Sequence, residues 1–522
     1  MKINRSENAV RNLRTGFLNK IITLICPFII RTIFIHTLGA EYLGVNSLFS
    51  SILSVLSLTE LGFSSAIVFF LYRAIATDDN TLINALLLYY RKVYRIVGIV
   101  FLSIGILLIP LLPYLVKGTY PDGIQPVTVY LIFLFNTAIS YFLYAYLGSL
   151  LIAFQRNDLQ DKVQVALTIL SHALQAVILL LARNYYAYLC IIPIFTILNN
   201  LAIAYIVKKN YPQFFPDGKL STDIKKDIQK KVKGLMIQKL CAVSRNSFDS
   251  IFVSLYLGLK EITIYNNYFY IINILTGFLL VFITAIEAGA GNSTATETQE
   301  KNYQDMVNTN IIYMWISGWC FTCLICLYQP FMTIWAGENL LLSMSSVLLF
   351  SVYFYILKMG DVRSIYVGTN GLFWEHRYRA IAESVLNIFL NWILGKYFGI
   401  NGIIAATIIS LFFVNFLYGS RIVFKYYFTH FKLRDFFLLH LYCASITVIT
   451  CVPTYLICSS IPSSIPGLLL RILICIVIPN ILIILIGQKI SRWRIAVSWV
   501  LNQFKIPAAK HIRMLILGNK SR

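Results

Sequence analysis

The chain has 522 residues, of which 58% are hydrophobic and only 13% charged, and its formal net charge is +22. With a mean hydropathy of +0.73, it falls outside the composition of soluble globular proteins, so we expect an integral membrane protein. The basic residues are spread over many turns and form no single stripe, so nucleic acid is not an expected partner. Anionic membrane lipids are the ordinary partner of such a surface.

Fourteen apolar segments follow one another along the chain, each of about 20 residues, the length that crosses a bilayer as a helix. The first seven begin near Leu13, Val45, Val93, Val127, Val163, Tyr185 and Leu235. The second seven begin near Ile262, Ile311, Leu340, Ile381, Ile400, Phe436 and Ile465. The sequence therefore predicts an all-α polytopic membrane protein with about 14 transmembrane helices.

The basic residues divide the connecting segments into two sets. One set carries 36 of the 44 Lys and Arg residues and comprises residues 1–20, 73–95, 155–162, 208–233, 290–305, 358–379, 421–435 and 488–522. The opposite turns carry only Lys117, Arg183, Lys260 and Lys396. Because basic loops stay in the cytoplasm, the first set is predicted to be cytoplasmic, and so are both termini.

The longest hydrophilic stretch, residues 208–233, divides the chain. We expect an N-lobe of six spans (residues 1–207), a cytoplasmic linker (208–233) and a C-lobe of six spans (234–425). The spans within residues 436–487 have no counterpart in the first half and form an extra pair. Residues 488–522 are a basic cytoplasmic tail, which we expect to rest on the inner leaflet as an amphipathic segment.

A faint internal repeat supports this division. Leu38-Gly39, followed by an apolar helix, recurs as Leu257-Gly258 after the first span of the second half. Parallel repeats commonly flank a substrate cavity near the bilayer midplane. The expected fold is therefore two parallel six-helix lobes around a central cavity, with two further helices at the C-terminal end.

Charged side chains inside the spans require an explanation, because each costs on the order of 3 kcal/mol at the centre of a span. They are Arg31, Glu60, Lys239, Arg245, Asp249, Glu287 and Arg471. Arg31 and Arg245 lie in the opening helix of each expected lobe. Lys20 precedes Arg31 by about three helical turns and shares its face.

Two interpretations of these charges remain open. Arg245 and Asp249 are four residues apart and can neutralise each other, and Lys239 can extend to the membrane surface. Alternatively, the cations line a water-filled cavity, where guanidinium groups suit phosphate oxygens. On the second interpretation the diphosphate-binding candidates are Arg31, Arg245, Lys20 and Lys239, and the candidate cavity or coupling acids are Asp249 and Glu60.

Polar and aromatic side chains in the same helices suit a sugar. Asn246, Asn266 and Tyr265 are candidate sugar contacts, although Asn and Tyr also join helices or mark membrane interfaces. No cofactor is expected. Cysteines 320, 323 and 326 share one face of an apolar span, and we interpret them as core packing and not as a metal site.

Three groups of residues carry a resemblance to a known family. They are LGAEYLGVNSLF (38–49) with LTELGFSSAI (58–67), IYNNY (264–268), and NGLF (370–373) with RY (377–378), ESVLN (383–387) and FGING (398–402). In this order they resemble polysaccharide flippases of the Wzx type, a branch of the multidrug/oligosaccharidyl-lipid/polysaccharide exporter superfamily. The resemblance implies a V-shaped transporter of two six-helix lobes. Such a protein moves an undecaprenyl-diphosphate-linked oligosaccharide from the inner to the outer leaflet by alternating access.

The leading hypothesis is therefore a flippase of the bacterial cytoplasmic membrane that serves capsule, exopolysaccharide or O-antigen-like assembly. Its substrate would be a lipid-linked oligosaccharide, and its partners a polysaccharide polymerase and glycosyltransferases. The alternatives are a multidrug or cation antiporter of the same superfamily and a membrane-embedded polymerase or glycosyltransferase. The chain has no P-loop, and its one adjacent acidic pair, Asp78-Asp79, falls in a predicted cytoplasmic turn. We expect a transporter and not an enzyme, and the sequence selects no coupling ion.

Overall fold

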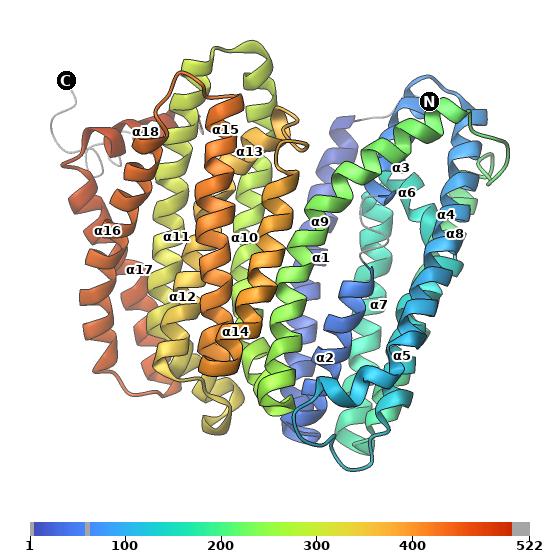
Figure 1. The fold of residues 1–522 in the computed structure, drawn as a ribbon, viewed down its shortest axis with the longest axis horizontal. Coiled ribbons are helices and arrows are strands. Elements are labelled where there is room, and N and C mark those ends of the chain that lie inside the picture. Colours follow the sequence, from blue (N-terminus) through green and yellow to red (C-terminus); the bar gives the residue numbers. More distant parts are fainter. Residues whose placement is uncertain (1–4, 58–62, 504–522) are drawn as a thin grey trace. The chain divides into compact units, whose positions relative to one another are not determined.

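The computed structural model describes residues 5–57 and 63–503. Within these two ranges every regular element is a helix (Figure 1). The chain divides into two compact units, Met1–Thr263 and Ile264–Arg522. The all-α class expected from the apolar segments is confirmed.

The first unit contains nine α-helices and three short helical turns within its described residues. They are α1 (Arg5–Thr37), α2 (Ala40–Leu56), α3 (Phe63–Ala76), α4 (Asn80–Leu107), η2 (Ile109–Leu115), α5 (Pro126–Phe142), η3 (Ala145–Leu147), α6 (Gly148–Ala153), α7 (Asn157–Val177), η4 (Ile178–Ala182), α8 (Tyr185–Asn210) and α9 (Thr222–Leu257). Polar caps set several of these starts. The side chains of Asp79 and Asn184 accept hydrogen bonds from the backbone N–H groups of Leu82 and Ala187, both at 2.9 Å, which satisfies donors that a helix start leaves open.

Helix α1 packs along α7, and α8 packs against both α5 and α7. Aromatic rings fill these contacts: Phe34 of α1 meets the ring of Tyr188 edge-on at 5.0 Å. The hydroxyl of Tyr130 donates to the carbonyl of Gly105 at 3.0 Å and ties α5 to α4. A buried hydroxyl thus finds a backbone acceptor inside a bundle that water does not reach.

The two glycines of the internal repeat have nearly the same backbone conformation. Gly39 (φ 98°, ψ 170°) joins α1 to α2, and Gly258 (φ 103°, ψ −175°) joins α9 to the next helix. This region of φ/ψ space is open essentially to glycine alone. The repeated Leu-Gly pair therefore forms the same type of helix-to-helix turn at both positions.

The second unit begins within α10 (Leu259–Thr296) and continues to α18. Its further elements are α11 (Gln299–Ala336), η5 (Glu338–Leu340), α12 (Met344–Met359), α13 (Asp361–Thr369), α14 (Arg377–Ile409), η6 (Ser410–Tyr418), α15 (Gly419–Tyr426), α16 (Leu433–Ser459), α17 (Ile465–Gly487) and α18 (Ser491–Gln503). Helix α11 contacts α12, α16, α17 and α18 and is the centre of this unit.

The continuous helical segment from Arg377 to Tyr426 is a hairpin and not a rod. Gly399 (φ 58°, ψ −135°) breaks the helix. The side chains of Asn387 and Thr407 on either side of it are hydrogen-bonded at 2.9 Å, whereas twenty residues of straight helix would separate them by about 30 Å. The segment therefore crosses the membrane twice, as the separate spans predicted from Ile381 and Ile400 require.

Several segments of the described chain can cross a bilayer. Nine segments of the described chain are long and apolar enough to span a bilayer, and eleven when each of two bent helix pairs is taken as one span. The hairpin adds one crossing to this number, and the described chain also has three shorter apolar helices, Ala40–Leu56, Ala66–Ala76 and Ser247–Leu257. Outward-facing apolar side chains such as Leu107, Leu181 and Leu441 are 64–82% exposed, as a lipid-facing surface requires.

The last helix of the described chain packs against α11. Trp493 of α18 is 3% exposed, and with Val497 and Leu501 it packs against Ile311 and Ile312 of α11. This apolar face is covered by protein, while Ile495 of the same helix is 57% exposed. Contact of the tail with the inner leaflet stays a prediction.

Candidate functional site

Helix α1 presents the two cations predicted for its one face. Lys20 is exposed and Arg31 is half-buried. One helical turn after Arg31, the ring of Phe34 meets the ring of Tyr188 in α8 at 5.0 Å. Arg31 thus lies within the apolar span of α1, in the part of that helix whose aromatic side chain contacts α8.

Helix α9 carries the second set of predicted charges. Arg245 is half-buried, and Asp249, one turn further on, is 2% exposed; both take part in interactions within the protein. The side chains of Lys239 and Asn246 lie outside the described part of this helix, and Glu60 lies in the undescribed residues 58–62. Both Arg31 and Arg245 belong to the first compact unit.

A polar cavity of about 370 Å³ lies between α5, α7 and α8 of the first unit. Its polar lining comprises Ser140, Gln164, Thr168, Ser171, His172, Gln175, Thr196, Asn199 and Asn200. Tyr188, whose ring contacts Phe34 of α1 at 5.0 Å, also lines it. Polar groups at this depth are costly in lipid and mark substrate or ion pathways. Arg31 and this cavity together form the candidate site of the first unit.

The residues of this cavity were not singled out as a site from the sequence, although part of the signal was present. Gln164, Thr168, Ser171 and Gln175 recur every three or four positions and line one face of α7, with His172 beside them. The Nδ1 atom of His172 is 2.8 Å from the carbonyl oxygen of Thr168. A row of polar side chains on an otherwise apolar span indicates a helix face that contacts water and not lipid.

The two sugar-contact candidates on α10 have different surroundings. Tyr265 is 3% exposed and packs against the rings of Phe269 and Phe350, at 6.0 and 5.2 Å. Asn266 is half-buried. Between these two, Asn266 is the side chain that a ligand can reach in this structure.

A buried ionic network occupies the second unit, where the sequence predicted a cytoplasmic connection. Lys358 lies at the end of α12 and Arg363 in α13, and they are only 3% and 1% exposed. The Lys358 ammonium donates to Oδ2 of Asp361 at 2.9 Å, and the Tyr313 hydroxyl donates to the same oxygen at 2.6 Å. This part of the network joins α11, α12 and α13.

A second set of buried polar contacts links α13 to the hairpin. Arg363 donates to the backbone and side-chain oxygens of Asn415 at 2.9 and 3.2 Å. Asn415 donates to Oε2 of Glu383 at 2.9 Å, and Arg379 donates to this oxygen at 2.6 Å. A chain of charge-assisted hydrogen bonds thus ties α13 to both arms of the hairpin.

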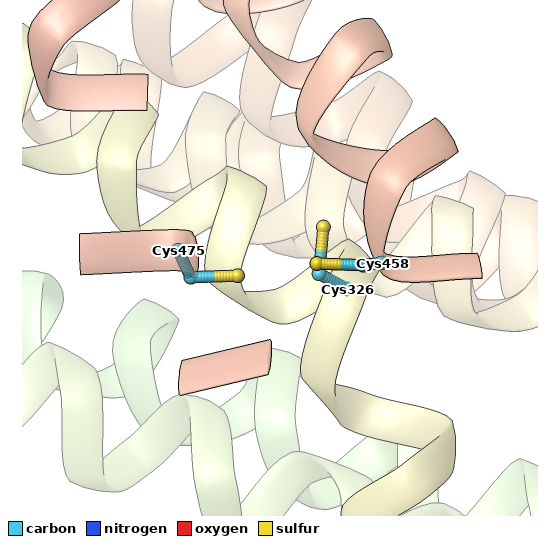
Figure 2. A group of neighbouring side chains, drawn as sticks. All are labelled: Cys326, Cys458 and Cys475. Carbon is cyan, nitrogen blue, oxygen red and sulfur yellow. The ribbon is translucent and has the colours of Figure 1, made fainter. Parts of the chain in front are cut away.

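Thiols from three helices meet in the second unit. The sulfur atoms of Cys326 (α11), Cys458 (α16) and Cys475 (α17) all lie within 4.8 Å of one another (Figure 2). This spacing would allow one soft metal ion to contact all three. The neighbours, however, are Cys323, Leu327, Tyr455 and Ile474, and deprotonating several thiols in largely apolar surroundings is unfavourable. We therefore assign the cluster to packing of α16 and α17 on α11.

Replacing Cys458 with alanine tests this assignment. The substitution removes a buried sulfur between three helices, so we expect the free energy of unfolding to fall by about 1 kcal/mol, mainly through lost van der Waals contact. Thermal unfolding of the purified protein in detergent, with and without a chelator, measures it. Cys190, which is exposed, provides the matched control. A large stability loss on chelation in the wild type alone would contradict a packing role.

The acidic pair Asp78-Asp79 has a structural role at the start of α4. The Thr81 hydroxyl donates to Asp79 at 2.7 Å and the Leu82 N–H at 2.9 Å. These hydrogen bonds hold the pKa of Asp79 below its usual value. The carboxylate of Asp79 is thereby committed to capping a helix.

Sequence comparisons identify no relative: no family model matches the chain, and no curated protein matches it. Solved structures do match. The chain is similar to the lipid II flippase MurJ in an inward closed conformation, with a TM-score of 0.64 and 16% identity over 92% of this chain and 99% of that one.

Two structures of multidrug resistance MATE family transporters of the MOP superfamily are similar as well. The inward-facing one has a TM-score of 0.59 at 16% identity and covers 79% of this chain and 98% of its own. The outward-facing one has a TM-score of 0.54 at 16% identity, with 80% and 95% covered. At such identities the likeness shows the fold alone. The chain has the fold of polytopic MOP-superfamily transporters.

Proposed function

We propose that the chain is a flippase that moves an undecaprenyl-diphosphate-linked oligosaccharide from the inner to the outer leaflet of the bacterial cytoplasmic membrane. The product would feed surface polysaccharide assembly, and a polymerase and glycosyltransferases would act on either side of this step. Both termini would face the cytoplasm. Transport would proceed by alternating access.

The observation that supports the proposal is a polar cavity in the first unit whose lining residue Tyr188 contacts Phe34, one helical turn from Arg31 on α1. A guanidinium offers several fixed donors to phosphate oxygens, and the Gln, Asn, Ser and Thr groups of the cavity offer hydrogen bonds to sugar hydroxyls. Arg245 on α9 supplies a second cation in the same unit. A diphosphate headgroup needs this kind of charge in the low dielectric of the membrane.

The structural similarity to MurJ also supports a lipid-linked substrate. The MurJ match covers 92% of this chain, whereas the two MATE matches cover 79% and 80%. A cation antiporter is the second candidate, and the MATE likeness favours it. An organic cation, however, would need acids in the cavity, and the described lining of the unit 1 cavity contains no carboxylate.

A competition experiment with the purified protein distinguishes the two candidates. We expect a prenyl-diphosphate-linked sugar to bind at least about tenfold more tightly than the corresponding prenyl alcohol, because a charge-assisted hydrogen bond contributes roughly 1.5–3 kcal/mol. An organic cation such as ethidium serves as the competing probe. Preference for the cation, or equal binding of the alcohol, would refute the flippase proposal.

A further inference from the structure

The open end of the α14–α15 hairpin forms a basic cavity of about 540 Å³. One side comes from Trp374, Arg377 and Tyr378 at the beginning of the hairpin, and the other from Arg421 and Lys425 near its end. Because the chain crosses the membrane and returns between these two sides, the cavity lies at a membrane surface. The positive-inside rule assigns this surface to the cytoplasm, where anionic lipids are concentrated.

Helical spacing collects the groups of the returning arm on one face. Tyr418, Arg421, Ile422 and Lys425 follow one another at intervals of three, one and three residues, and all four line the cavity. The side chains of Arg421 and Lys425, one turn apart, are both exposed. Two cations on one helical face repel each other unless an anion lies between them.

The third cation of the cavity, Arg377, has a side chain that neighbouring groups fix in position. The Arg377 guanidinium lies 3.9 Å from the centre of the Trp374 ring and 4.2 Å from that of Tyr378, and its Nη1 donates to the carbonyl of Trp374 at 2.6 Å. Stacking and one hydrogen bond fix the group, while its other N–H donors remain for a ligand. Such a fixed guanidinium loses little entropy when it binds an oxyanion.

Charge and ring exposure both suit a lipid headgroup. Three cations face one carboxylate, that of Glu375, in the lining. Trp374 and Tyr378 are each 61% exposed, and exposed Trp and Tyr rings at the end of a span are typical of the headgroup region. A soluble anion would gain nothing from these rings.

We infer that this cavity binds the phosphate of a membrane lipid headgroup at the cytoplasmic surface. Arg377, Arg421 and Lys425 contact the phosphate oxygens, and Trp374 and Tyr378 lie along the glycerol or prenyl portion. The inference does not depend on transport activity. The same phosphate chemistry has two sources, the anionic phospholipids of the bilayer and a prenyl diphosphate that waits to be transported.

Native mass spectrometry of the full chain tests the inference. Lipid retention is compared for phosphatidylglycerol, for zwitterionic phosphatidylcholine and for a prenyl diphosphate. With about 1 kcal/mol for each basic residue near a membrane surface, the double substitution Arg421→Ala, Lys425→Ala is expected to weaken binding of the phosphate lipid roughly 30-fold.

The control variant is Lys226→Ala, Lys230→Ala, which removes two exposed cations with the same spacing from α9. This control variant should retain phosphatidylglycerol and the prenyl diphosphate as the wild type does. Loss of phosphatidylglycerol alone identifies a bilayer lipid as the occupant, and loss of the prenyl diphosphate alone identifies a cargo lipid. Equal retention of both lipids by the two variants, at equal thermal stability, would overturn the inference.

Discussion

Replacing both Arg31 and Arg245 with alanine is expected to slow transport of a prenyl-diphosphate-linked oligosaccharide about 100-fold or more. Each charge-assisted hydrogen bond to a diphosphate contributes roughly 1.5–3 kcal/mol, and about 2.7 kcal/mol corresponds to a factor of 100. Arg31 is half-buried within α1 and Arg245 within α9. Their loss removes positive charge where the lipid headgroup must leave the aqueous surface.

Transport into proteoliposomes with a fluorescent lipid-linked sugar measures this effect, and the polymer output of cells gives a second readout. The matched control is Lys260→Ala, Lys396→Ala, since these two exposed cations lie in predicted outer turns. Arg31→Lys should retain part of the activity, because lysine keeps the positive charge but lacks the planar guanidinium group with its several N–H donors. Wild-type transport by the double alanine variant would remove both arginines from the site.

The polar cavity of the first unit can be predicted from the sequence only in part. The apolar segments predict the helices, and the stripe from Gln164 to Gln175 predicts a polar face on α7. What that face meets depends on the packing of α5 and α8, which carry Ser140 and Asn200. Helices that are apolar nearly all round give no periodic signal for their partners.

The ionic network of the second unit was missed for a related reason. Lys358 and Arg363 follow an apolar span, so composition places them in a cytoplasmic turn, where basic residues are common. Their burial is made possible by partners distant in sequence: Arg363 meets Asn415, and Asn415 meets Glu383. Only the hairpin turn at Gly399 brings these three together. The sequence around each of these residues does not show that the hairpin brings them together.

Neutralising Glu383 is expected to cause a large loss of stability. Its Oε2 accepts from Arg379 at 2.6 Å and from Asn415 at 2.9 Å, and its side chain is 2% exposed. Glu383→Gln keeps the shape but leaves the charge of Arg379 without its carboxylate partner. Removing one partner of a buried ion pair typically costs about 3–5 kcal/mol, because the remaining charge stays desolvated.

Thermal unfolding of the purified protein in detergent measures this loss, and the chain supplies a matched control. Lys301 and Asp305 form an ion pair with the same four-residue spacing, at 3.0 Å, but their side chains are 52% and 21% exposed. Asp305→Asn should therefore cost below about 1 kcal/mol, since water replaces the lost contact. If the two substitutions lower the unfolding midpoint equally, the network contributes no more than a surface ion pair. A marked difference instead assigns to Glu383 the role of holding α13 and both arms of the hairpin together.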